Sequence, residues 1–168
     1  MGLMRYLSDA RVRLEMLTLM PSDEEREEIP RERWLRDLKE RVIHEMCDLL
    51  LTSSDIRNPN KLFIDLHNRE KQWSTALGHG VAFPHVRTMH TRTLVFAIGR
   101  SMPGIDYDAP DGEPVHLFFS MVCPPYEDQI YRRFAKQLAI AVTYGGLVDQ
   151  ALQATTVGEM MRLVDGLV

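Results

Sequence analysis

A histidine at the end of a short apolar run is the feature of this 168-residue sequence best suited to chemistry. Gly78 and Gly80 precede the run, and Pro84 stands directly before His85. Glycine permits backbone conformations barred to other residues and lets a bulky group approach closely. Proline fixes its own φ and favours an extended residue before it. We therefore expect His85 at a stiff strand end with bare backbone nearby, a suitable place to hold a phosphoryl group.

The chemistry that such a histidine favours is phosphoryl transfer. A neutral imidazole is a competent nucleophile near pH 7 because its pKa lies close to that pH. The transferred group also needs donors or cations for its oxygens. Arg69, Thr75 and the backbone of the two glycines are the candidates for that role. A purely structural histidine at a strand end is the alternative.

Metal and cofactor sites are poorly supported by the spacing. No H-x-x-x-H or H-x-H pair occurs in the sequence. The i, i+3 pair of His44 and Cys47 falls on a largely apolar helix face. A zinc site would therefore require ligands that are distant in the sequence to come together in the fold. The glycines around His79 lack the third glycine and the following helix of a dinucleotide site. We predict no metal and no cofactor. The histidines are His44, His67, His79, His85, His90 and His116.

A stretch rich in Gly and Pro contains three carboxylates, Asp106, Asp108 and Asp111. Two of them could form a pair of catalytic carboxylates. Asp and Gly favour turns through local hydrogen bonds and tolerance of positive φ. We interpret the stretch as a turn, with paired catalytic carboxylates as the alternative.

Composition excludes several classes of protein. Hydrophobic residues make up 45% of the chain, which excludes wholesale disorder, and the formal charge of −4 does not suit a nucleic-acid binder. The apolar runs are too short to span a bilayer, and the N-terminus lacks the apolar core of a signal peptide. Cys47 and Cys123 lie in apolar surroundings and are expected to be small buried hydrophobes. These features indicate a cytoplasmic protein in a reducing compartment.

Hydrophobic periodicity predicts alternating helices and strands. The pattern favours an α/β fold: a single domain over 1–168 with a mixed sheet flanked by helices on both faces, an atypical N-terminal region and an acidic loop at about 21–29. The predicted helices cover 3–8, 30–52, 59–71, 127–144, 147–153 and 157–165, the predicted strands cover 12–16, 93–99 and 115–122, and 103–114 is predicted as loop.

Two motifs resemble a known family. Arg69-Glu70, Ser74-Thr75 and Gly78-His79-Gly80-Val81-Ala82-Phe83-Pro84-His85 look like the phosphorylation-site motif of the fructose/mannitol-type enzyme IIA domains of the bacterial phosphoenolpyruvate-dependent sugar phosphotransferase system, shared by the nitrogen-regulatory IIA proteins. Ile105-Asp106-Tyr107-Asp108-Ala109 with Asp111-Gly112-Glu113-Pro114-Val115 resembles the family's turn-and-strand signature. The resemblance covers about residues 60–145.

This resemblance implies that His85 is the phosphoacceptor, that Arg69 lies near the phosphohistidine, and that Thr75 is a hydroxyl residue of the motif. Two positions depart from the family pattern. Val86-Arg87 replaces the usual glycine and basic residue, and Arg87 is expected to supply positive charge. Tyr131 stands where many members carry a second histidine, and could donate a hydrogen bond.

The sequence therefore predicts a phosphoryl-accepting protein of the phosphotransferase system, charged by the histidine-phosphorylated carrier protein. It would be a phosphohistidine carrier rather than a free-standing turnover enzyme. A chain with no attached transport domain suits regulation of a target protein or transporter better than dedicated sugar uptake. The alternative is a degenerate IIA-like module that regulates its partner without phosphoryl transfer.

Overall fold

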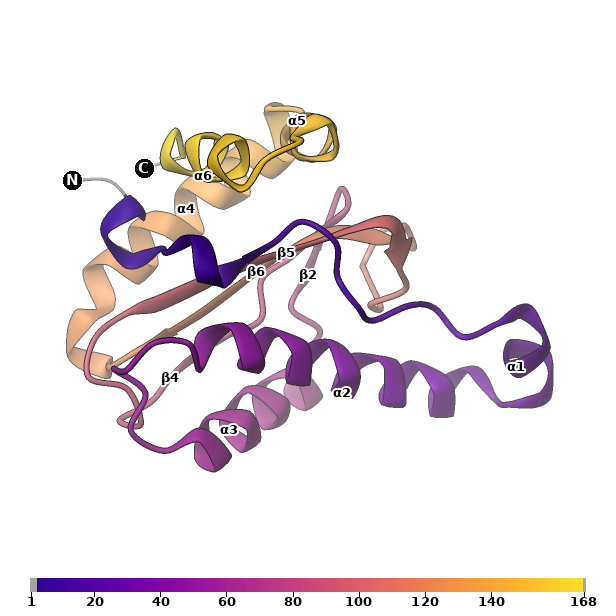
Figure 1. The fold of residues 1–168 in the computed structure, drawn as a ribbon. Helices are drawn as coiled ribbons and strands as arrows, with labels where there is room; N and C mark the ends of the chain where they lie inside the picture. The colour runs from indigo at the N-terminus through magenta and orange to yellow at the C-terminus, as the bar shows by residue number, and fades with distance from the viewer. Residues whose placement is uncertain (1–2, 168) are drawn as a thin grey trace.

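A six-stranded mixed sheet lies between two layers of helices in the computed structural model, which describes residues 3–167 (Figure 1). Met1, Gly2 and Val168 lie outside the described residues, although the expected domain included them. The strands are β1 Val12–Arg13, β2 Ala76–Gly78, β3 Val81–Ala82, β4 His85–Arg87, β5 Val95–Ile105 and β6 Val115–Cys123. The helices are α1 Asp23–Glu28, α2 Arg31–Leu50, α3 Pro59–Gln72, α4 Asp128–Tyr144, α5 Leu147–Gln153 and α6 Val157–Asp165, with 3₁₀ turns η1 Leu3–Tyr6, η2 Asp9–Arg11 and η3 Pro125–Glu127.

The strand β6 is the centre of the sheet. It pairs antiparallel with β5 on one side, and on the other side it pairs parallel with β3 and then with β4. In this register Val81 lies opposite Leu117, and His85 lies opposite Met121. His85 is therefore placed beside the C-terminal part of β6, close to the point where the chain turns into α4.

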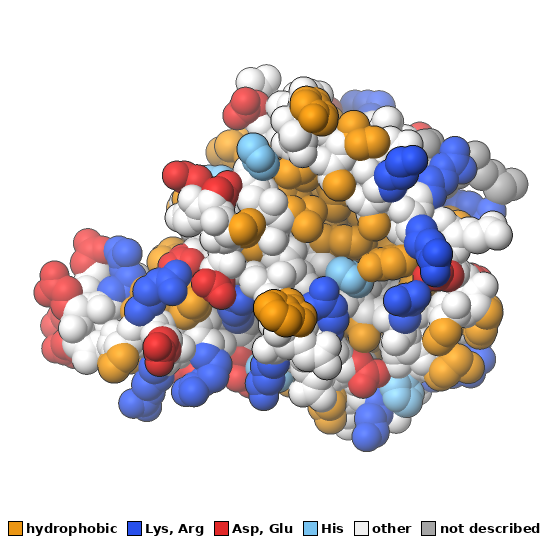
Figure 2. Space-filling model, turned by 180° about the vertical axis from the view of Figure 1, so that it is seen from behind, with side chains coloured by type: hydrophobic (Ala, Val, Ile, Leu, Met, Phe, Trp, Pro, Cys, Tyr) orange, Lys and Arg blue, Asp and Glu red, His pale blue; other side chains and the backbone are white. Residues whose placement is uncertain are grey.

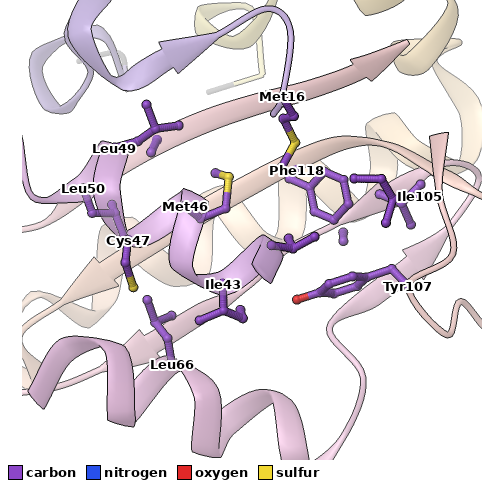
Figure 3. Close-up of a cluster of buried hydrophobic side chains, with 14 of the residues drawn as sticks. Met16, Ile43, Met46, Cys47, Leu49, Leu50, Leu66, Ile105, Tyr107 and Phe118 are labelled. Carbon is purple, nitrogen blue, oxygen red and sulfur yellow. The ribbon is translucent and has the colours of Figure 1, made fainter. Parts of the chain in front are cut away.

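Both faces of the sheet are covered by helices, as predicted. The residues Leu117, Phe119 and Met121 of β6 belong to the core cluster that includes α4, α5 and α6. The alternate residues Phe118 and Val122 belong to the cluster that includes α2, shown in Figure 3. A strand buried on both faces is mostly apolar, which explains why six of the eight residues over 115–122 are apolar.

The helices α3 and α6 begin where the sequence predicts, and a side-chain cap marks the start of each. The side chain of Asn58 accepts a hydrogen bond from the backbone of Lys61 at the start of α3, and Thr156 does the same for Glu159 in α6. These contacts satisfy N–H groups that have no partner within the helix. Both cysteines are buried as expected, and burial raises the pKa of Cys47 to about 12 and that of Cys123 to about 11.

The acidic segment at 21–29 is not a loop, and that prediction was wrong. Residues Asp23–Glu28 form α1, which lies away from the sheet in Figure 1. The Ser22 hydroxyl accepts from the backbone N–H of Glu25, and the Glu25 carboxylate accepts from the backbone N–H of Ser22. This capping box, together with acidic residues in the first turn, stabilises a helix that hydrophobic periodicity cannot reveal.

Two strand lengths also differ from the prediction. The first strand covers only Val12–Arg13 rather than 12–16. Strand β5 continues to Ile105 through Pro103 and Gly104, which were predicted as loop. The register of β5 against β6 shifts between Arg100 and Ile105, and a proline is tolerated at such an irregularity because no regular ladder bond is lost.

Within residues 3–167, no helix has both the length and the apolar character needed to cross a membrane.

Phe134 of α4 joins the helix layer to the segment that carries the histidine. Its ring centroid lies 5.3 Å from that of Phe83 and 4.9 Å from that of Phe96, and its side chain is fully buried. We expect Phe134→Ala to lower the free energy of unfolding by about 3–5 kcal/mol because a cavity is left in the core. Urea denaturation followed by circular dichroism measures this loss. Ile140→Ala on the exposed side of the same helix should cost less than about 1 kcal/mol, and equal losses would contradict the assignment of Phe134 to the core.

Candidate functional site

A tight hairpin fixes the approach to His85. Gly78, His79 and Gly80 all have positive φ, between 52° and 83°, so the chain reverses within three residues between β2 and β3. The backbone N–H of His79 donates to Asp111 Oδ2 at 2.7 Å. A Cβ atom at Gly78 would approach the same oxygen to 3.2 Å, so a side chain there would crowd this anchor as well as strain the backbone.

The His85 ring is held by the backbone just before it. Its Nδ1 lies 2.7 Å from the carbonyl oxygen of Phe83, and since a carbonyl only accepts hydrogen bonds, Nδ1 carries the proton. The electron pair of the neutral ring is therefore on Nε2. Phe83 is held in turn because its N–H donates to the carbonyl of Thr75 at 2.9 Å.

Two aromatic rings flank this imidazole. Its centroid lies 4.5 Å from the Phe83 ring and 5.2 Å from the Tyr131 ring, and the histidine side chain is half-buried. Burial lowers the pKa of His85 below its ordinary value because the charged ring loses solvation. The hydrogen bond to Phe83 opposes this effect, and the positive charges of Arg69 and Arg87 add to it. The ring is therefore neutral near pH 7.

Arginine side chains dominate the charge around the ring. Arg69 at the end of α3 donates to the carbonyl of Trp73 at 3.0 Å, a neutral acceptor. Arg87 donates to Asp128 at 2.8 Å, and its guanidinium carbon lies 5.4 Å from the centroid of the Tyr131 ring. Arg132 pairs with the same aspartate. Arg87 and Arg132 thus share one carboxylate and Arg69 pairs with none among the described residues, although the chain as a whole has a net charge of −4.

Thr75 is placed differently from the sequence-based expectation. Its side chain is buried, and its hydroxyl donates to Glu70 rather than to the imidazole or toward solvent. Glu70 also accepts from the backbone N–H of Thr75 and from Lys39 of α2, each at 3.0 Å. Thr75 therefore supports the histidine through its backbone carbonyl, and Glu70 holds Thr75 in place.

The aspartates at 106–111 form turns, as expected. The Asp106 carboxylate accepts from the N–H of Asp108, and Asp111 accepts from the N–H of Glu113. Asp106 also pairs with Arg31, whereas Asp111 faces the hairpin, so the two carboxylates do not converge on one cleft. Across residues 3–167, no three His, Cys, Asp or Glu side chains are arranged to hold a metal ion.

The sequence profile of the family "Phosphoenolpyruvate-dependent sugar phosphotransferase system, EIIA 2" matches residues 36–166, which is most of the chain and includes the whole region around His85. The chain belongs to this family. Residues before Arg36, including α1, lie outside the matched region of this EIIA domain.

Two relatives of this EIIA domain differ in how much of their own length it covers. It is 28% identical over 127 residues to the "PTS system fructose-specific EIIABC component" of Bacillus subtilis, covering 76% of this chain but only 20% of that protein. It is 27% identical over 126 residues to the "Nitrogen regulatory protein" of Pseudomonas aeruginosa, covering 75% of this chain and 82% of that protein.

Solved structures share the EIIA fold. The nitrogen regulatory protein IIA-Ntr of Neisseria meningitidis aligns with a TM-score of 0.75 at 25% identity, over 95% of this chain and 97% of that one. The mannitol IIA of Escherichia coli aligns with a TM-score of 0.69 at 15% identity, over 94% and 98%, and that likeness shows the fold alone.

Sequence reasoning missed three residues of this EIIA site. Glu70 was quoted only as part of a motif, although its position next to Arg69 was a usable signal. Asp128 lies three residues before Tyr131 and four before Arg132, spacings that place side chains on one face of a helix. Lys39 carried no signal, because its pairing with Glu70 joins two helices far apart in the sequence.

The pKa of His85 tests this geometry. We expect the ring to titrate below its ordinary value of about 6.5, because burial and nearby arginines disfavour the protonated form. Arg69→Gln should raise this pKa by removing one positive charge. NMR titration of the imidazole signals measures both values. Arg133→Gln, an exposed change elsewhere on α4, is the matched control. A pKa at or above the ordinary value in the unaltered chain would contradict the burial of the ring.

Proposed function

We propose that Nε2 of His85 accepts a phosphoryl group from the histidine-phosphorylated carrier protein of the phosphotransferase system. The observation that carries the proposal is the 2.7 Å hydrogen bond from Nδ1 to the Phe83 carbonyl, which leaves the electron pair of a neutral ring on Nε2. Membership of the EIIA family supports it, since the matched region contains His85, Arg69 and Tyr131.

The transfer needs little from the protein beyond positioning and charge. The Nε2 electron pair forms a bond to phosphorus as the bond to the carrier's ring nitrogen breaks, and that nitrogen keeps the electron pair of the broken bond. No proton has to leave Nε2 of the neutral tautomer. The proton stays on Nδ1, which donates it to the Phe83 carbonyl, and this hydrogen bond stabilises the positive charge that develops on the ring.

The positive charges of the arginines are complementary to the negative charge of a phosphorylated histidine. A phosphoryl group adds about −1.5 to −2 charges at neutral pH. Arg69, Arg87 and Arg132 together carry three positive charges against the single charge of Asp128. In this proposal Arg69 and Arg87 offset the phosphoryl charge. Tyr131 packs against the ring and limits the directions from which the phosphorus can approach.

One face of the molecule suits docking of a protein donor. Figure 2 shows apolar side chains gathered in a central hollow of this face, with Lys and Arg side chains along the right-hand border. An apolar centre with a charged rim is the usual anatomy of a protein–protein interface. The carrier would present its phosphohistidine across this face.

We also propose that the role is regulatory. The similarity to nitrogen regulatory proteins of Pseudomonas aeruginosa and Neisseria meningitidis, over most of the length of those chains, supports this reading. Phosphorylation would change the charge of the face from positive to nearly neutral and so alter binding to a target protein or transporter.

The experiment is incubation of the protein with phosphoenolpyruvate, the carrier protein and the kinase that charges it, followed by intact-mass measurement. We expect a mass gain of one phosphoryl group that is lost in acid. His85→Ala should abolish it because no other nucleophile occupies the position. His79→Asn is the matched control, since asparagine tolerates the positive φ at this position and Nε2 of His85 is untouched.

Phosphorylation of His85→Ala at the wild-type level would overturn the proposal. Failure of the wild type to gain mass, while the carrier protein itself is charged, would overturn it as well and would favour a binding module that regulates its partner without phosphoryl transfer.

A further inference from the structure

A groove lies between α2 and α3, and Glu70 is part of its lining, whereas His85 is not. Its volume is about 430 Å³, within the range of small-molecule sites. Its walls include the apolar Leu35 and Ile43 of α2 and the indole of Trp73, which is 79% exposed. A large aromatic side chain exposed beside a hollow is a ready contact for a ligand. No step of the proposed phosphoryl transfer uses this groove.

The charges that line the groove are balanced. Three positive and three negative side chains line the same hollow: Arg36, Lys39, Lys71, Glu32, Glu70 and Asp108. Among the described residues, Lys71 and Glu32 have no ion-pair partner within 4.0 Å, and Arg36 reaches only the exposed Asp37 at 3.7 Å. A pure anion would face three carboxylates here, and a pure cation would face three cations. A small zwitterion is complementary to both sets.

A series of hydrogen bonds links Lys39, in the lining of the groove, to His85. Lys39, whose side chain is 16% exposed, donates to Glu70, and Glu70 accepts from Thr75. The Thr75 carbonyl accepts from the N–H of Phe83, whose own carbonyl holds Nδ1 of His85. A change at Lys39 therefore reaches the imidazole through groups that are almost all buried.

Behind the wall of the groove, next to Lys39, lies a polar group without a hydrogen-bond partner in the described part of the chain. The hydroxyl of Tyr107 is fully buried and makes no hydrogen bond with any described residue. Figure 3 shows it pointing toward Ile43, between α2 and α3. The Lys39 ammonium lies 5.0 Å from the centroid of the Tyr107 ring. A buried unpaired hydroxyl is costly, so an arrangement that gave it a partner would be favoured.

We propose that this groove binds a free α-amino acid and that occupancy slows phosphorylation of His85. The amino acid's carboxylate pairs with Arg36 and Lys71, and its ammonium group pairs with Glu32 and Asp108. Its carboxylate also draws Lys39 away from Glu70, and the Tyr107 hydroxyl becomes a donor to Glu70 in its place. A neutral hydroxyl does not compensate the carboxylate charge as the ammonium does, so Glu70 is placed less firmly and holds Thr75 less firmly. The binding site stands on its own, whereas the effect on His85 rests on the function proposed above.

Isothermal titration calorimetry with each of the twenty amino acids tests the binding site. At least one should bind, and its amine and carboxylic acid analogues, which each lack one charge, should bind about tenfold more weakly or not at all. Arg36→Gln should weaken binding about tenfold, because a charge-assisted hydrogen bond is lost. Lys61→Gln makes a similar charge change on α3 outside the groove and should leave the affinity unchanged.

Tryptophan fluorescence tests whether the ligand binds next to Trp73. In a Trp34→Phe variant the emission comes from Trp73 alone, since the chain has two tryptophans. Binding should shift that emission, because the indole at the rim leaves water. Binding of no amino acid at millimolar concentration, equal binding of the singly charged analogues, or unchanged affinity in Arg36→Gln would overturn the site.

The second measurement addresses the coupling. The rate of His85 phosphorylation by the charged carrier should fall in the presence of the bound amino acid, and Lys39→Met should remove this response. An unchanged or faster rate with the ligand bound would overturn the coupling. Failure of the phosphorylation itself appears without any ligand, so it is distinguished from failure of the groove, which calorimetry reports independently.

Discussion

The hydrogen bond between Nδ1 of His85 and the Phe83 carbonyl is the constraint on which the site depends. It assigns the ring proton to one nitrogen and leaves the electron pair on the other. The carbonyl itself is fixed from two sides, because the Phe83 backbone is bonded to Thr75 and its ring packs against Phe134. The β2–β3 hairpin, the central strand and α4 thus all serve to hold one imidazole in one orientation.

The carboxylates of Glu70 and Asp128 have different roles at the site because their surroundings differ. Glu70 is almost entirely buried and accepts from Lys39 and twice from Thr75, so its charge is fully compensated. The buried pair of Lys39 and Glu70 fixes the positions of these side chains but adds little to the stability of the fold, since the cost of desolvation offsets much of the attraction. Asp128 lies at the surface and is shared by Arg87 and Arg132. It orders the two arginines without neutralising them, which leaves the face positive.

Several structural features that depend on residues close together in the sequence were predicted correctly. The starts of α3 and α6 and the strand β6, which is buried on both faces, were predicted correctly because each depends on a few neighbouring residues. The helix α1 was missed because its signal is a capping box rather than an apolar face. The Thr75 hydroxyl was predicted to serve the oxygens of a phosphoryl group, whereas it donates to Glu70, a contact that depends on how the chain turns between α3 and β2. The pairing of Lys39 with Glu70 spans 31 positions and has no local signal.

Tyr131 decides how strongly the charge of this face changes. The rings in contact with His85 belong to Phe83 and Tyr131, and neither titrates near neutral pH, since burial raises the pKa of Tyr131 above its ordinary value. A second imidazole there could take up a proton as a phosphoryl group arrived and so cancel part of the added charge. With a phenol in that place, the added negative charge is met only by the fixed arginines. Phosphorylation, as proposed, therefore produces the full change of charge at the surface that a partner contacts.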